Sequence, residues 1–211
     1  MKRFNKVQGL VAAAVGVALL AGGLATASNM GFKFVPNIAA NQFFDLSLPW
    51  NNNYAKASNL LSDLPGANRV SRYNGSGSIT DWFAGASSSS NFNIVKGDAY
   101  IVRAGGSGVN TAVVVGSHDP AFTFAFTANQ FRNASAPYHQ TLTKASQVLN
   151  DMKTQMGANS VNRVSRYNGN GSITDWFSGA SPASNFNLTL GMGVIVRGGS
   201  AGGSGYVWPH Y

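Results

Sequence analysis

Three histidines and no cysteine define what metal or nucleophilic chemistry the 211-residue chain can offer. His118 stands between Ser117 and Asp119, which are the side-chain types of a catalytic triad. A triad needs its three groups to face one another in space, and three consecutive residues do not supply that geometry. The spacing of His118, His139 and His210 is not typical of a zinc site either, and cysteine ligands are absent. The sequence therefore predicts no catalytic set, no metal and no cofactor, and a protein that is not an enzyme.

Two loops with the sequence NGxGSITD are the weak candidates for calcium binding. They run from Asn74 to Asp81 and from Asn168 to Asp175, with oxygen-bearing side chains at alternate positions and a carboxylate at the end. A calcium loop normally supplies several carboxylates, whereas each of these supplies one. The alternative interpretation is an Asn-Gly turn whose aspartate pairs locally, with Arg72 or Arg166 as the partner.

Aromatic residues recur at matching places and could stack against sugar rings. The apolar face of a pyranose suits an aromatic platform, and in a small domain the same residues also serve as core. The sequence does not place these rings inside or outside. The candidates for sugar stacking are Tyr73, Trp82, Tyr167 and Trp176, with Trp50 as a further aromatic nearby.

The NGxGSITD loops and the stacking candidates Tyr73, Trp82, Tyr167 and Trp176 belong to a duplicated stretch. Residues 70–103 recur as residues 164–197 without a gap and with 10 differences in 34 positions. A repeat of this length indicates a duplicated structural unit. The chain is therefore organised by repetition.

The first residues and the composition indicate export. Lys2, Arg3 and Lys6 precede an apolar span of about fifteen residues and an Ala-x-Ala site at residues 25–27, the pattern of a cleaved secretory signal peptide. A membrane anchor would need about twenty apolar residues, and a pilin-like leader would need a glutamate after the cut. Without the signal, 12 basic residues face 7 acidic ones, a net charge of +5. The basic residues are dispersed, so nucleic acid is not an expected partner, and no membrane association is expected after cleavage.

The elements of each unit follow from apolar periodicity and turn residues. Phe44, Leu46 and Leu48 alternate with polar residues as in a half-buried strand, and a displacement of 78 residues lays Phe122, Phe124 and Phe126 over them. Helices are expected at 54–64 and 144–157, the second longer by six residues. Each unit is predicted as β-β-α-β-β-β-β, with a strand at 92–94. The predicted fold class is α+β, mostly β, with two tandem duplicated small domains, each an antiparallel sheet with one covering helix.

The predicted organisation is a signal peptide at 1–27, repeat domains at 28–107 and 108–203, and an extra C-terminal strand at 204–211. This last strand carries Tyr206, Val207, Trp208 and Tyr211. It either pairs within its own domain or adds to the sheet edge of a neighbouring molecule. Only 10% of the residues are charged, which predicts a weakly charged, adhesive surface.

The repeat resembles one that recurs, often in tandem, in poorly characterised secreted surface proteins of environmental bacteria. The resemblance rests on LPW-N, a short helix, N-R-V-S-R, D-W-F, N-F-N-(I/L) and a closing G-x-x-(Y/V)-I-V-R, over residues 31–105 and about 109–199. In this alignment the second unit lacks the Pro49-Trp50 pair and has Thr127-Ala128 instead. The resemblance implies export and repetition, and it implies no activity.

The leading hypothesis is an exported bacterial structural protein, secreted or at the cell surface. It is expected to assemble with itself into a filament, surface layer or matrix, by donating its C-terminal or leading strand to a neighbour. The alternative is a tandem carbohydrate-binding or adhesion module using Trp82 and Trp176, with polysaccharide as the partner.

Overall fold

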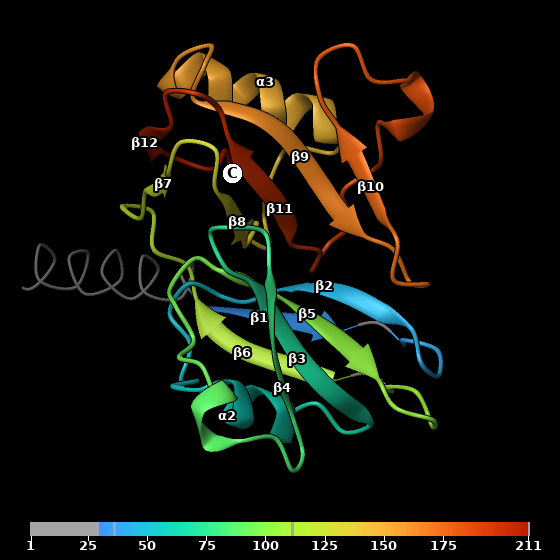
Figure 1. Ribbon diagram of the computed structural model, residues 1–211. Helices are drawn as coiled ribbons and strands as arrows, with labels where there is room; N and C mark the ends of the chain where they lie inside the picture. Colours follow the sequence, from blue (N-terminus) through green and yellow to red (C-terminus); the bar gives the residue numbers. More distant parts are fainter. Residues whose placement is uncertain (1–29, 36, 111, 211) are drawn as a thin grey trace, which may run out of the picture.

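The computed structural model of the chain describes residues 30–35, 37–110 and 112–210 (Figure 1). The predicted signal peptide lies outside these residues. The first repeat comprises β1 (Met30–Val35), β2 (Phe43–Ser47), α2 (Ala57–Ser62), β3 (Ala67–Tyr73), β4 (Ile79–Phe83), the short 3-10 helix η1 (Ser88–Ser90), β5 (Ala99–Ala104) and β6 (Ala112–Ser117). The second comprises β7 (Phe124–Phe126), β8 (Phe131–Ala134), α3 (Ala145–Met156), β9 (Val161–Tyr167), β10 (Ile173–Trp176), η2 (Pro182–Ser184), β11 (Val194–Gly198) and β12 (Gly203–Tyr206).

Each repeat forms a four-stranded antiparallel sheet with one helix on one face. The strand order is β4-β3-β5-β2 in the first repeat and β10-β9-β11-β8 in the second. Helix α2 packs against β3 and β4, and α3 packs against β9 and β12. The predicted α+β class, with two duplicated antiparallel sheets each covered by a helix, is confirmed.

The core of each repeat lies between its helix and its sheet. In the longer helix, Val148, Leu149 and Met152 recur at helical spacing and are almost fully buried. They pack with Val164 and Val196 of the sheet behind them. The shorter helix places Ala57 and Leu60 in the equivalent cluster. Burial of these apolar stripes, rather than the intrinsic propensity of such short helices, is what stabilises them.

The structure corrects the predicted alignment of the leading strands. The strand equivalent to β2 is β8, because each is the inner edge strand of its sheet. Phe43 pairs with Arg103 as Phe131 pairs with Arg197, which gives a displacement of 88 residues rather than 78. Asn41 and Asn129 precede the two strands with the same unusual positive φ, 61° and 58°. Pro49-Trp50 is therefore matched by Pro137-Tyr138, and the later displacement of 94 reflects the six extra residues after the start of α3.

One predicted strand is absent from the described residues of the first repeat. Residues 92–94 form no strand; only Asn93 makes an isolated bridge to Lys56, beside the start of α2. The segment is instead fixed by the side chain of Asn91, whose Oδ1 accepts a hydrogen bond from the Ser58 N–H at 3.0 Å. It therefore serves to close the first turn of α2.

The two sheets pack face to face, with α3 outside one and α2 outside the other (Figure 1). Strand residues alternate between faces, so Val70 and Val102 point toward α2 while Ser71 and Ile101 point toward the other repeat. Ser165 and Ile195 are their equivalents, and all four inner residues are almost fully buried. Asp45 and Ser47 are also buried, although β2 was predicted to be half-buried, because the second repeat covers the face on which they lie.

Hydrogen bonds across the contact occur in matched pairs. The Phe43 N–H donates to the Gly169 carbonyl at 2.9 Å, and Phe131 donates to Gly75 at 3.0 Å. Two further bonds repeat the pattern nearby, from Ser47 to Gly191 and from Ser135 to Gly97. Equivalent residues exchange places across the contact, so the repeats are related by an approximate twofold axis. The inner edge strands β2 and β8 are thereby partly satisfied by the opposite repeat.

Two small ribbons flank this sandwich. Strand β6 pairs with β1, although the predicted boundary at 107/108 assigns β6 to the second domain. Strand β12 pairs with β7, so the extra C-terminal strand lies against its own repeat. Tyr206 and Trp208 are fully buried there, and Tyr211 lies outside the described residues.

Candidate functional site

The outer edge strands β4 and β10 carry matching exposed apolar pairs. Ile79 and Phe83 of β4, Ile173 of β10, and Phe177 directly after β10 are between 39% and 47% exposed. By strand alternation they lie on the inner face of each sheet, beyond the part that the opposite sheet covers. We call them the overhang residues. A surface groove of about 530 Å³ beside Phe83 extends this exposed region.

Ion pairs border each overhang. Arg69 Nη1 lies 3.3 Å from Asp81 Oδ2, and Arg163 Nη1 lies 3.1 Å from Asp175 Oδ2. The two aspartates of the NGxGSITD loops therefore do pair locally, but with Arg69 and Arg163 rather than with Arg72 and Arg166.

The rest of the first NGxGSITD loop is a hydrogen-bonded turn. Asn74 Oδ1 accepts bonds from the Ser76 hydroxyl and the Ser78 N–H, at 2.7 and 2.9 Å. Gly77 adopts φ +91°, which favours glycine. In the second loop Asn168 Nδ2 donates to the Ser172 hydroxyl at 2.9 Å. The weak calcium candidates are thus engaged with protein groups, as the alternative interpretation of an Asn-Gly turn expects.

Two equivalent grooves lie where the repeats meet. One, of about 540 Å³, is lined by Tyr73 and Arg132 among others, and the second, of about 460 Å³, by Tyr167 and Phe44. The ring of Tyr73 stacks on Phe131 at 5.9 Å between centroids, and Tyr167 packs against Phe43 at 5.3 Å. The candidate sugar-stacking tyrosines therefore border open grooves.

The tryptophan candidates lie elsewhere. Trp82 packs against the core of the first repeat, and Trp176 packs against the core of the second. Trp50 is buried and donates from Nε1 to the Ser135 carbonyl at 3.2 Å. The structure thus separates the tyrosines from the tryptophans, which the sequence alone grouped together.

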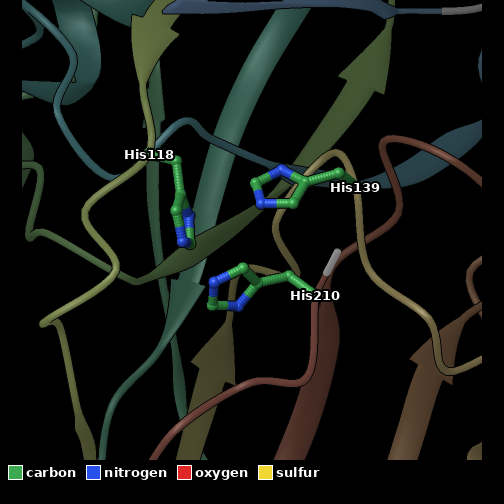
Figure 2. A group of neighbouring side chains, drawn as sticks. All are labelled: His118, His139 and His210. Atoms are coloured by element: carbon green, nitrogen blue, oxygen red, sulfur yellow. The ribbon is translucent and has the colours of Figure 1, made fainter. Parts of the chain in front are cut away.

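The structure brings all three histidines together (Figure 2). His118 follows β6, His139 follows β8, and His210 follows β12 near the C-terminus. One ligand atom from each ring lies within 4.8 Å of the other two. Sequence spacing missed this cluster because the three residues come from three segments that meet only through the tertiary fold.

Backbone and side-chain contacts position each histidine. Asn51 and Ser117 exchange two backbone hydrogen bonds, at 3.0 and 2.9 Å, just before His118. The indole of Trp50 packs against the His118 ring, with centroids 4.4 Å apart. His210 is held near His139 because the Thr141 N–H donates to the Pro209 carbonyl at 3.2 Å.

Burial favours the neutral imidazole in two of the three histidines. Burial, reinforced by the neighbouring His210 and His139, lowers the pKa of His118 to about 4. Burial also lowers the pKa of His139. Ser117 and Asp119 do not join them, because the Ser117 hydroxyl accepts a bond from Asn51 and Asp119 pairs with Lys96. Ser117, His118 and Asp119 therefore contact different partners and do not form a catalytic triad with one another.

Comparison with known proteins assigns no family to the chain. No protein-family model, curated protein or solved structure matches it significantly. Among the described residues no helix is long and apolar enough to span a membrane.

Proposed function

We propose that the protein is an exported, non-enzymatic structural protein that assembles with copies of itself through its overhang residues. The single observation that carries this proposal is the presence of equivalent exposed apolar pairs along the two outer sheet edges, Ile79 with Phe83 and Ile173 with Phe177. Within the chain, this same sheet face packs against its equivalent in the other repeat. A second copy can extend that packing to the part left uncovered.

The size of the contact sets the conditions for assembly. Full burial of an Ile or Phe side chain contributes about 1.5–3 kcal/mol, so completing the burial of four half-exposed side chains contributes about 4 kcal/mol. Association also costs at least about 4 kcal/mol in lost translational and rotational freedom, so the apolar contact alone gives only weak association. Hydrogen bonding between the outer edge strands adds to it. Assembly is therefore expected at high local concentration, as in a surface layer or matrix.

Strand donation, the route expected from sequence, has less support than the overhangs. Tyr206 and Trp208 are buried against their own repeat, and β1 pairs with β6. Donating either strand would first require breaking these intrachain contacts. The overhangs need no such rearrangement.

Negative-stain electron microscopy and size-exclusion chromatography of residues 28–211, up to about 1 mM, test the proposal. Ordered polymers are expected for the wild-type chain, and none for the double variant Phe83→Ser/Phe177→Ser. The matched control is Val115→Ser/Leu190→Ser, which removes apolar groups that are 64% and 62% exposed outside the overhangs. Wild-type monomers at every concentration, or undiminished polymers of the overhang double variant, would refute the proposal.

Single variants distinguish the two ways in which the overhangs can meet. If the β4 overhang binds the β10 overhang of a neighbour, growth is open-ended. Phe83→Ser and Phe177→Ser are then each monomeric, and an equimolar mixture of them forms dimers. If like overhangs meet, each single variant alone forms dimers.

A second candidate function, carbohydrate binding, is favoured by the twin grooves bordered by Tyr73 and Tyr167. A glycan array tests it, with Tyr73→Ala/Tyr167→Ala expected to abolish any signal. Trp82→Ala and Trp176→Ala do not serve as binding variants, because both tryptophans pack against the cores. A blank array with the folded wild-type chain would exclude this candidate for the glycans displayed.

A further inference from the structure

The histidine cluster is a second feature of the chain, independent of the overhang residues. We infer that His118, His139 and His210 form a binding site for one divalent transition-metal ion of the zinc and copper class. The inference rests on three imidazoles that converge from separate segments (Figure 2). These are all the histidines of the chain, and cysteine is absent.

The distances are within reach of metal coordination. Three atoms no more than 4.8 Å apart have a common point at most about 2.8 Å from each of them. Zinc–nitrogen bonds are about 2.0–2.1 Å long, so each nitrogen has to move inward by about 0.7 Å. Small rotations of the side chains supply such a movement without a change in the backbone.

A hydrogen bond already orients one of the proposed ligands. His210 Nδ1 lies 2.8 Å from the Trp208 carbonyl oxygen, which can only accept, so Nδ1 carries the hydrogen. The lone pair is then on Nε2, the nitrogen available to a metal. A carbonyl on the far ring nitrogen is the usual outer partner of a metal-bound histidine. Trp208 is itself fixed, because its Nε1 donates to Gln140 Oε1 at 3.0 Å.

His118 presents a buried nitrogen to the same site. The residue is 6% exposed, and its Nε2 makes no hydrogen bond to any other described residue. A buried polar atom left without a partner is costly, and a metal ion would satisfy it. Beside the ring lies a cavity of about 10 Å³, lined by Trp50, Pro137 and others. This cavity is close to the smallest space that holds one water molecule, and of the three histidines only His118 lines it.

The ligand set selects the class of metal. Imidazole suits zinc, copper and nickel, whereas calcium and magnesium prefer oxygen ligands. The cluster contains histidine alone and no carboxylate. Hard cations are therefore not expected to bind there.

The repeat relationship gives the stoichiometry. The displacements of 88 and 94 residues match His118, His139 and His210 to Met30, Asn51 and Gly116 in the first repeat. That place offers no second set of imidazoles, and a side chain at Gly116 would collide with Pro49 and Asn51. The chain is therefore expected to bind one ion and not two.

Isothermal titration calorimetry of the mature chain with zinc, copper and magnesium chlorides tests the inference, with any histidine tag removed. Zinc and copper are expected to bind at one ion per chain and to raise the melting temperature, and magnesium is expected to do neither. His210→Gln and His139→Gln should each weaken binding at least about tenfold, as loss of a metal-orienting group does. Asn150→Gln, at an exposed position of α3 outside the histidine cluster, is the control and should bind as the wild type does.

X-ray absorption at the zinc edge of the wild-type complex keeps the test valid if a variant fails to fold. Three imidazole ligands with or without one water are the expected result. Absence of zinc and copper binding would overturn the inference. Binding that survives both histidine substitutions, or a zinc shell of oxygen ligands, would overturn it equally.

Discussion

A buried carboxyl at the contact between the repeats makes stability depend on pH. Asp45 is 2% exposed, and its Oδ1 accepts no hydrogen bond from the other described residues. Its Oδ2 accepts one from the Tyr167 N–H. Burial raises the pKa of Asp45 from 3.8 to about 7, although the Tyr167 bond and the nearby Arg166 act in the opposite direction. In the second repeat the equivalent residue is Asn133, which accepts the same bond from Tyr73.

We expect Asp45→Asn to stabilise the protein at neutral and alkaline pH. Because the folded-state pKa of this acid is raised, the folded state holds the proton more tightly, and stability falls as pH rises from about 4 to about 7. The pKa of Asp45 rises from 3.8 in the unfolded chain to about 7 in the folded protein. This difference lowers the free energy of unfolding by about 4 kcal/mol above pH 7, relative to its value below pH 4. The substitution removes that loss, whereas near pH 4 wild type and variant should differ by less than about 1 kcal/mol.

Urea unfolding followed by tryptophan fluorescence at pH 4, 5, 6, 7 and 8 measures the effect, with EDTA present to exclude metal. The quantity to compare is the slope of the free energy of unfolding against pH in the wild type and in Asp45→Asn. Burial also raises the pKa of Asp98, which contributes to the slope of both proteins, so only the difference between the two slopes reports on Asp45. Asn133→Asp is the reciprocal control and should add a second decline over the same interval. An Asp45→Asn protein with the wild-type slope, or with lower stability at pH 8, would refute the reasoning.

Three further substitutions probe the fold. Trp208→Ala should cost about 3–5 kcal/mol in urea unfolding, as for other buried aromatics, and limited proteolysis should then cut the C-terminal segment first; a loss below 1 kcal/mol would contradict its role in the core. Gly85→Ala should cost about 1–2 kcal/mol in free energy of unfolding, because Gly85 has φ +88°. Gly106→Ala, which also has open space around it, should change the stability little. Equal losses in the two variants would show that the positive φ of Gly85 is not the cause. In a double-mutant cycle, Arg69→Met and Asp81→Asn should show a coupling energy of at most about 1 kcal/mol, because both side chains are about one-third exposed. A larger coupling energy would contradict this partial exposure.

The repeated segment made the sheets and helices predictable, because its hairpins and turn residues are local features. The correspondence between β2 and β8 was missed for a physical reason. Phe122, Phe124 and Phe126 imitate the alternation of Phe44, Leu46 and Leu48, while the six extra residues of α3 change the displacement between repeats. Alternation alone cannot tell which of two apolar runs joins the sheet.

The functional features that sequence missed depend on contacts between distant segments. The burial of Asp45 follows from a second repeat that covers the face of β2 opposite its own core, whereas its polar character indicated that this face is exposed. The histidine cluster needs the C-terminal segment to return beside the link between repeats. The overhang residues look like ordinary strand residues until the crossing of the two sheets leaves them uncovered.

The approximate twofold contact within one chain has a consequence for how such a protein changes over time. A dimer of identical subunits must carry every substitution at two symmetric places, so a charge or a ligand introduced near its axis always appears twice. Joining the halves in one chain removes that constraint. Asp45 in the first repeat corresponds to Asn133 in the second, and the three histidines have no counterparts in the first repeat. One half can therefore acquire a specialised group while the other keeps the contact intact.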